Sequence, residues 1–121
     1  MKTCLIVDDS EVIRKVARRI LEGMHFMVVE AESGEMGLEQ CRKQMPDAVL
    51  IDWQMPVMSG IEFLSALRMQ ATQRPPMVFY CTTENDADDI TRAFTAGADD
   101  YILKPYDLQS VALKFTETGL L

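Results

Sequence analysis

The chain has 121 residues, of which 48% are hydrophobic and 26% are charged, and its formal net charge is −7 at pH 7. This length and composition are typical of one globular domain over residues 1–121 and exclude a disordered or fibrous chain. The acidic balance argues against direct binding of nucleic acid, which needs a basic surface. Because no apolar stretch approaches the ~20 residues of a transmembrane helix, we also expect no membrane insertion.

The start of the chain and its cysteines predict a cytoplasmic location. Met1 leads almost directly into the first apolar run, so we expect no signal or transit peptide. Cys4, Cys41 and Cys81 are odd in number and widely spaced, which does not fit a disulfide scaffold. Cys4 and Cys81 fall in predicted strands and are expected to be small core residues. We expect no output domain, so that the domain would act alone.

The predicted elements alternate between strands and helices in chain order. Short apolar runs predict buried strands over residues 4–7, 26–30, 48–51, 77–81 and 100–103. Apolar residues at the helical period predict helices over residues 10–23, 33–44, 61–67, 87–96 and 108–115, the first of them capped by Ser10. Strand–helix units joined by right-handed crossovers give a doubly wound α/β fold, a three-layer sandwich around a parallel sheet.

Two of these helices carry specific predictions of burial. The apolar residues of one helical face are expected to pack on the sheet. They are Ile90, Ala93 and Phe94 in the fourth helix, and Leu108, Val111, Ala112 and Phe115 in the last.

Four of the predicted strands end on a charged or hydroxylic residue. The first ends on Asp8 and Asp9, the third on Asp52, the fourth on Thr82 and the fifth on Lys104. Because the carboxyl ends of parallel strands share one edge, where ligands bind, we expect these side chains to meet. The resulting cleft would combine carboxylates with a hydroxyl and an ammonium group.

Such a cleft has a definite chemistry. Neighbouring carboxylates repel one another and raise at least one pKa unless a cation is present. Mg²⁺ suits the site best, because Mg²⁺ takes one or two carboxylates and fills its other positions with water and phosphate oxygens. Mn²⁺ is an alternative. Asp52, alone at its strand end, can attack phosphorus as a nucleophile, whereas the doublet Asp8-Asp9 is better placed to hold metal. Lys104 and Thr82 would stabilise charge on the transferring phosphoryl group.

The set Asp8-Asp9, Asp52, Thr82 and Lys104-Pro105, with Trp53-Gln54-Met55-Pro56 and Gly60 after Asp52, resembles the receiver domain of bacterial two-component response regulators. The resemblance covers the whole chain and is closest to the stand-alone, CheY-like type. It implies a flavodoxin-like fold with the sheet order 2-1-3-4-5. It also implies that Asp52 accepts a phosphoryl group from a phosphohistidine on a sensor histidine kinase or a histidine phosphotransfer protein.

The resemblance assigns roles to the other residues of the cleft. Asp9, Asp52 and the backbone carbonyl of Gln54 would ligate Mg²⁺, with Asp8 acting through water. Thr82 and Lys104 would bind the phosphoryl oxygens, and a cis peptide bond is expected between Lys104 and Pro105. Tyr101 matches the switch aromatic, which turns inward as Thr82 moves toward the phosphate. An ordinary strand aromatic is the alternative for Tyr101.

Three positions bear on how long the phosphoryl group persists before autodephosphorylation. Thr83 stands where the family usually has Ala or Gly, which would narrow the access of a donor to Asp52. Gln54 and Glu84 lie two residues beyond Asp52 and Thr82, where side chains commonly govern the attacking water.

Two charged patches leave alternatives open. The basic residues of the first helix form either a solvated face with the pairs Glu11–Lys15 and Arg18–Glu22, or a docking surface for a histidine-bearing helical bundle. These basic residues are Arg14, Lys15, Arg18 and Arg19. The acids at the start of the fourth helix either complement the helix dipole or form an output surface for a basic partner. They are Glu84, Asp86, Asp88 and Asp89.

Several functions remain compatible with this reading. Within the receiver class, the chain could be a chemotaxis-type effector, a phosphorelay intermediate or a phosphate sink, and its downstream target is not specified. We expect a monomer, with a dimer through the face of the fourth helix, fifth strand and last helix as the alternative. A magnesium-dependent phosphohydrolase is a remote alternative, since the DxDx[TV] pattern and a cap insertion are absent. A flavin mononucleotide carrier would not place Asp8-Asp9 after the first strand.

Overall fold

The computed structural model describes residues 1–70, 72–83 and 87–121. Its strands form one five-stranded parallel sheet in the order β2-β1-β3-β4-β5, which confirms the fold class and strand order expected from the sequence. The strands are β1 (Thr3–Val7), β2 (Met27–Ala31), β3 (Ala48–Asp52), β4 (Met77–Thr82) and β5 (Asp100–Leu103). The helices are α1 (Glu11–Gly23), α2 (Gly34–Lys43), α3 (Gly60–Arg68), α4 (Ala87–Ala96) and α5 (Leu108–Glu117).

Side-chain caps fix where most of these helices begin. Ser10 accepts a hydrogen bond from the Ile13 amide at the start of α1, as the sequence predicts. Ser33 and Asp107 cap α2 and α5 in the same way. Ser59 forms a capping box with Glu62 at the start of α3. Each cap satisfies an amide that has no partner within its helix, so the loops leaving the strands end at defined residues.

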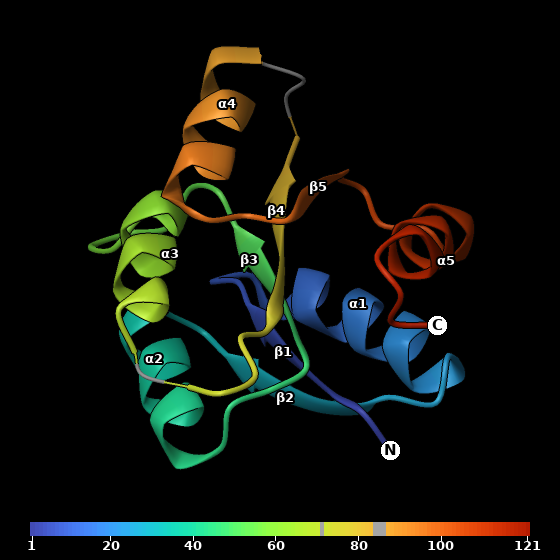
Figure 1. Cartoon of the computed structure of the whole chain (residues 1–121). Helices are drawn as coiled ribbons and strands as arrows, with labels where there is room; N and C mark the ends of the chain where they lie inside the picture. The colour runs from blue at the N-terminus through green and yellow to red at the C-terminus, as the bar shows by residue number, and fades with distance from the viewer. Residues whose placement is uncertain (71, 84–86) are drawn as a thin grey trace.

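The helices cover both faces of the sheet (Figure 1). One face packs against α1 and α5 through a cluster that includes Leu21 and Phe115, and the other packs against α2, α3 and α4 through a cluster that includes Phe63. Successive residues of β1 alternate between the two clusters, Ile6 toward α1 and Leu5 toward α3. Because both faces are buried, the central strands β1, β3 and β4 are apolar between their terminal residues.

Two burial predictions are wrong. On α4 only Ala93 is fully buried among the residues described, and Phe94 is 43% exposed. Ala93 belongs to the buried cluster on this side of the sheet. Phe94, the next residue along α4, lies further round the helix and therefore faces away from that cluster. On α5 the buried residues are Val111 and Phe115, whereas Leu108 is 57% exposed because the helix meets the core only after its first turn.

The three cysteines are free buried thiols, as expected for Cys4 and Cys81. Burial raises the pKa of the Cys41 thiol to about 11, which keeps it protonated near neutral pH. No helix within the described ranges is long and apolar enough to cross a membrane.

Candidate functional site

The register of the sheet brings the predicted site residues to one edge. Val7 of β1 pairs with Ile51 of β3, so the residues that follow them, Asp8 and Asp52, lie at the same level. Asp52 in turn pairs with Cys81, the residue before Thr82. Thr82 pairs with Leu103, the residue before Lys104, and the Lys104 amide donates a hydrogen bond of 2.8 Å to the Thr82 carbonyl oxygen. The prediction that the strand ends converge is therefore confirmed.

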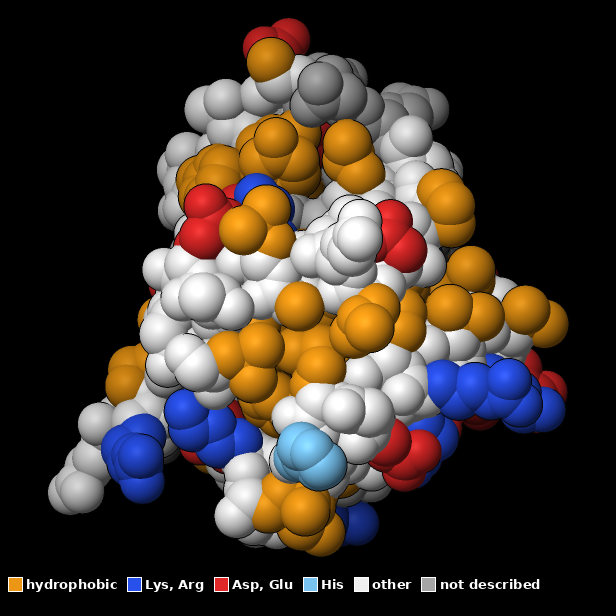
Figure 2. Space-filling view, turned by 90° about the vertical axis from the view of Figure 1, so that its right-hand side faces the viewer, with side chains coloured by type: hydrophobic (Ala, Val, Ile, Leu, Met, Phe, Trp, Pro, Cys, Tyr) orange, Lys and Arg blue, Asp and Glu red, His pale blue; other side chains and the backbone are white. Residues whose placement is uncertain are grey.

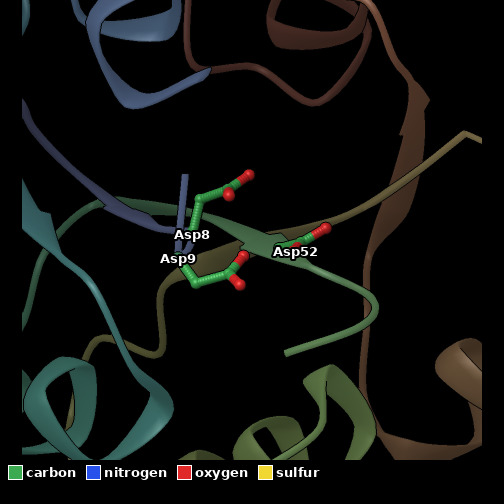
Figure 3. A group of neighbouring side chains, drawn as sticks. All are labelled: Asp8, Asp9 and Asp52. Carbon is green, nitrogen blue, oxygen red and sulfur yellow. The ribbon is translucent and has the colours of Figure 1, made fainter. Parts of the chain in front are cut away.

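Three carboxylates gather at this edge (Figure 3). Asp8 and Asp9 follow β1 and Asp52 ends β3, and one oxygen from each lies within 4.8 Å of the others. Asp8 is 2% exposed and Asp52 is 6% exposed, whereas Asp9 is exposed to solvent. The cluster thus has two buried members beneath one that faces water.

Lys104 inserts between the two buried carboxylates. Its ammonium nitrogen lies 2.7 Å from Asp8 Oδ2 and 2.6 Å from Asp52 Oδ1. Its side chain is 9% exposed, so these ion pairs are shielded from water. The peptide bond between Lys104 and Pro105 is cis, as expected.

The electrostatics of the cluster oppose ionisation of Asp52. Burial raises the pKa of Asp52, the charges of Asp8 and Asp9 raise it further, and the contact with Lys104 lowers it without outweighing them. Burial alone would lower the pKa of Lys104, but its hydrogen bonds with Asp52 and Asp8 prevail and raise it. Lys104 therefore stays charged, while the carboxylates remain in excess of the one ammonium group. A cation at this edge would relieve that excess.

The donor set fits Mg²⁺. The carboxylates of Asp8, Asp9 and Asp52 supply only oxygen atoms, which Mg²⁺ prefers, and the exposed Asp9 leaves one side of the cluster open to water or phosphate oxygens. No sulfur or imidazole group belongs to the cluster, so the softer metals that favour such ligands are less well matched.

The loop between β3 and α3 is packed tightly behind Asp52. A Cβ atom at Gly60 would lie 2.6 Å from the Asp52 carbonyl oxygen, so only glycine fits there. The Trp53 amide donates to the Cys81 carbonyl, which extends the β3–β4 pairing past Asp52. Within the same loop, Val57 has a φ of 70° and is 90% exposed. A branched residue rarely adopts this left-handed conformation.

The remaining predicted site residues lie around the cluster. Thr82 is fully buried at the end of β4, and Thr83 is exposed. The side chain of Gln54 is exposed and lines a hollow of about 310 Å³ with Trp53 and Asp89. Glu84 and Asp86 lie outside the described residues.

Tyr101 is half-buried on β5 at the edge of the sheet. The ammonium of Lys114 lies 4.4 Å from the centre of its ring, and also 3.0 Å from Asp100 Oδ1. Tyr101 and Lys114 line a groove of about 190 Å³ with the exposed residues Leu103 and Leu113. Figure 2 views the molecule from the α5 side and shows hydrophobic side chains spread over the surface on that side.

The basic patch on α1 is smaller than the sequence suggests. The pairs Glu11–Lys15 and Arg18–Glu22 form as predicted. Arg14 and Arg18, however, both bind Glu30 of β2, at 3.0 Å and 2.6 Å, and are partly buried. A solvent-facing patch composed of all the basic residues of α1 is therefore wrong, because a carboxylate on the neighbouring strand draws these two side chains inward.

Sequence reasoning also missed a contact between β4 and α4. Tyr80 is 1% exposed, and its hydroxyl donates a hydrogen bond of 3.2 Å to Asp89 Oδ2. Burial raises the pKa of Tyr80 above its ordinary value, and the nearby Asp89 charge raises it further. In the sequence, the only indication of this contact was the large side chain of Tyr80 in a predicted buried strand. That indication did not identify Asp89 as the partner of the hydroxyl.

Together, the fold and its edge define a class of protein, a flavodoxin-like α/β domain with an acidic, hydroxyl and lysine site at the carboxyl ends of its strands. Its family is defined by comparison with known proteins. Residues 4–115 match the model of the response regulator receiver domain family, and the chain belongs to that family.

Relatives and solved structures agree. The chain is 36% identical over 110 residues to the chemotaxis protein CheY of Halobacterium salinarum, covering 91% of this chain and 90% of that protein. It resembles the chemotaxis protein CheY4 of Vibrio cholerae with a TM-score of 0.91 and 29% identity, over 97% and 98% of the two chains. It also resembles the receiver domain of the response regulator Ssk1 of Saccharomyces cerevisiae, solved with the histidine phosphotransfer protein Ypd1, with a TM-score of 0.88 and 25% identity, over 98% and 89%.

The first curated relatives are longer proteins. The chain spans 44% of the length of transcriptional regulators with which it shares 36% identity. What the comparisons establish is a CheY-like receiver domain of two-component signalling. Receiver domains are phosphoacceptors and generally bind Mg²⁺ at an acidic pocket.

Proposed function

We propose that this chain acts as a single-domain response regulator in which Asp52 accepts a phosphoryl group from a phosphohistidine. The donor would be a sensor histidine kinase or a histidine phosphotransfer protein. The observation that carries the proposal is the meeting of Asp8, Asp9, Asp52 and Lys104 at one edge of the sheet. The relative of which the chain covers 90% supports a stand-alone role.

The transfer is a displacement at phosphorus. An oxygen of the Asp52 carboxylate forms the new bond to phosphorus, and the bond between phosphorus and the donor imidazole nitrogen breaks. That nitrogen keeps the electron pair of the broken bond, and because the other ring nitrogen of the phosphohistidine already carries a proton, the donor leaves as a neutral imidazole. Lys104 moves from the carboxylate to an oxygen of the phosphoryl group, which keeps its positive charge beside the developing negative charge.

Asp9, Asp52 and the carbonyl of Gln54 would hold Mg²⁺, with Asp8 acting through water, and Mn²⁺ could replace it. When bound, the dication offsets the charge of the carboxylates and of the incoming phosphoryl group. The chain contributes the position of its own groups. Asp8 is fixed by the Ser10 amide, 2.9 Å from its Oδ1, and by Lys104 at its Oδ2, which leaves the exposed Asp9 free to meet the metal.

The signal would leave the site through Thr82 and Tyr101. Thr82 binds a phosphoryl oxygen, and Tyr101 turns inward to fill the space that Thr82 vacates. The half-buried position of Tyr101, beside a groove with the exposed residues Leu103 and Leu113, supports this role. The face formed by α4, β5 and α5 would then bind a protein target, or a second copy of the chain.

The lifetime of the phosphoryl group would depend on the side chains around Asp52. Gln54 and Glu84 would direct the attacking water in autodephosphorylation, and Thr83 would narrow the access of the donor. The exposure of Gln54 supports its contact with the attacking water, and the exposure of Thr83 supports its effect on the access of the donor. The free buried thiols support action in the cytoplasm, where disulfides are rare.

The experiment is phosphorylation by acetyl phosphate in the presence of Mg²⁺. We expect the wild-type chain to take up one phosphoryl group, which alkali removes, and Asp52→Asn to take up none. Asp88→Asn, which changes an exposed aspartate of α4, is the matched control and is expected to behave as wild type. An undiminished adduct in Asp52→Asn, or no adduct in the wild type, would reject the proposal.

A further inference from the structure

Arg14 links the acidic loop to the neighbouring strand. Its Nη1 donates a hydrogen bond of 2.7 Å to the carbonyl oxygen of Asp8, and its Nε donates one of 3.0 Å to Glu30 Oε1 on β2. Its side chain is 13% exposed, so both contacts are largely shielded from water. The guanidinium is planar and holds several donors in a fixed geometry, which lets it fix the two acceptors relative to each other.

Arg18 provides an internal comparison. It binds the other oxygen of Glu30 at 2.6 Å, and it also reaches Glu22 and the Val28 carbonyl. Arg18 therefore ties α1 to β2 as Arg14 does, but its hydrogen bonds do not include Asp8. Joining the helix to the strand does not require Arg14, and what distinguishes Arg14 is its contact with the acidic loop.

That contact acts on the peptide unit between Asp8 and Asp9. The Asp8 carbonyl, the Asp9 amide and the Asp9 Cα atom lie in one rigid plane. Fixing the carbonyl therefore fixes the position of the Cα atom from which the Asp9 side chain projects. The carboxylate of Asp9 has no ion pair or hydrogen bond to any residue in the described part of the chain. Its position therefore depends on the main chain, which Arg14 and the bond from the Asp8 amide to the Ala31 carbonyl hold in place.

If the charge of Arg14 were its only influence, Arg14 would weaken the binding of a metal ion at this site. A positive charge near a site for a dication lowers the affinity of that site, so removing the Arg14 charge should tighten metal binding if charge were its only influence. Glu30 offsets part of this cost by pairing with the guanidinium. The sign of the change in affinity therefore separates a positioning role from a charge effect.

We propose that Arg14 is a positioning residue for the metal site, which orients Asp9 by holding the carbonyl oxygen of Asp8 against Glu30. This inference rests on the proposed function, because it takes Asp9 as a ligand of Mg²⁺. Loss of a residue that orients a metal ligand typically weakens metal binding by about tenfold or more.

The test is calorimetric titration of the metal-free chain with Mg²⁺. We expect Arg14→Gln to raise the dissociation constant about tenfold. Arg18→Gln, which removes the same charge and the same Glu30 partner, should stay within about twofold because it leaves the Asp8 contact intact. At saturating Mg²⁺, the control Arg18→Gln should accept the phosphoryl group from acetyl phosphate at close to the wild-type rate, because its contacts with Glu30, Glu22 and Val28 lie away from Asp8.

Arg14→Lys keeps the charge but has one ammonium group, which cannot reproduce the fork between Asp8 and Glu30. It is expected to weaken Mg²⁺ binding as well, and it serves as the test if Arg14→Gln does not fold. Equal or tighter Mg²⁺ binding by the Arg14 variants would overturn this inference alone. Absence of Mg²⁺ binding by the wild-type chain would overturn the proposed function together with it.

Discussion

The ammonium of Lys104 lies 2.6 Å from the carboxylate of Asp52, although the two residues are separated by 52 positions in the chain. The same nitrogen lies 2.7 Å from Asp8. One cation thus serves two buried carboxylates at the end of a parallel sheet. The stability of the fold and the readiness of the site for a dication consequently depend on the same side chain.

Replacing Lys104 tests that dependence. Lys104→Met leaves two buried carboxylates without their cation, and breaking a buried pair costs about 3 kcal/mol or more. We expect the free energy of unfolding in urea, without divalent metal, to fall by about this amount. Added Mg²⁺ should recover part of the loss, because a dication replaces the missing charge.

The control is Lys15→Met, which removes a surface lysine whose pair with Glu11 is well exposed. We expect its effect to stay below about 1 kcal/mol, with no added response to Mg²⁺. Equal losses in the two variants would contradict the account of the buried pair.

Gly60 allows α3 to begin directly behind Asp52. In Gly60→Ala the new Cβ would lie 2.6 Å from the Asp52 carbonyl oxygen, a backbone atom, so the loop must shift. We expect a loss of about 1–3 kcal/mol in urea unfolding and slower phosphorylation by acetyl phosphate. Gly23→Ala is the matched control, since a Cβ there meets nothing within 4 Å and should have little effect on either measurement.

Val57 is held in a conformation that costs free energy. Its φ is 70° and its side chain is 90% exposed, so a substitution loses almost no packing. Asn tolerates the left-handed region better than a branched residue, and we expect Val57→Asn to raise the free energy of unfolding by about 1 kcal/mol. Val12→Asn, on the exposed face of α1, should give no such gain, and a destabilised Val57→Asn would argue against strain at this position.

Glu30 gives a prediction with a defined pH dependence. Burial raises the pKa of Glu30, but hydrogen bonds from Arg18 and Arg14 prevail and lower it below its ordinary value of 4.5. Because the folded state binds the proton less tightly than the unfolded chain, the ionised group stabilises the fold above about 4.5. That contribution disappears as the pH falls through the lower value in the folded state.

We therefore expect Glu30→Gln to lower the free energy of unfolding by about 1–2 kcal/mol at neutral pH. The difference from wild type should shrink as the pH falls below 4.5. A difference that stays constant across that range would contradict the assignment to the ionised carboxylate.

The strand ends were predictable because parallel strands of similar length stop at the same edge. Apolar runs marked where β1, β3, β4 and β5 end, and the residue after each run therefore lies at the site. Metal ligation, phosphoryl transfer and the switch of Tyr101 remain predictions, since position alone does not establish a role.

Other features left no usable pattern in the sequence. The pairing of Arg14 and Arg18 with Glu30 depends on the lateral packing of α1 beside β2, which periodicity does not encode. The exposure of Phe94 depends on how closely Ala93 approaches the sheet. The left-handed backbone of Val57 contradicts its local preference, so it was visible only in the folded chain.

Reduction of the phosphorylated chain with borohydride tests the central claim most directly, because it converts an acyl phosphate of aspartate to homoserine. After reaction with acetyl phosphate and Mg²⁺, peptide mass spectrometry should place homoserine at residue 52 alone. Homoserine at position 8 or 9, or its absence from the chain, would contradict the assignment of Asp52 as the phosphoacceptor.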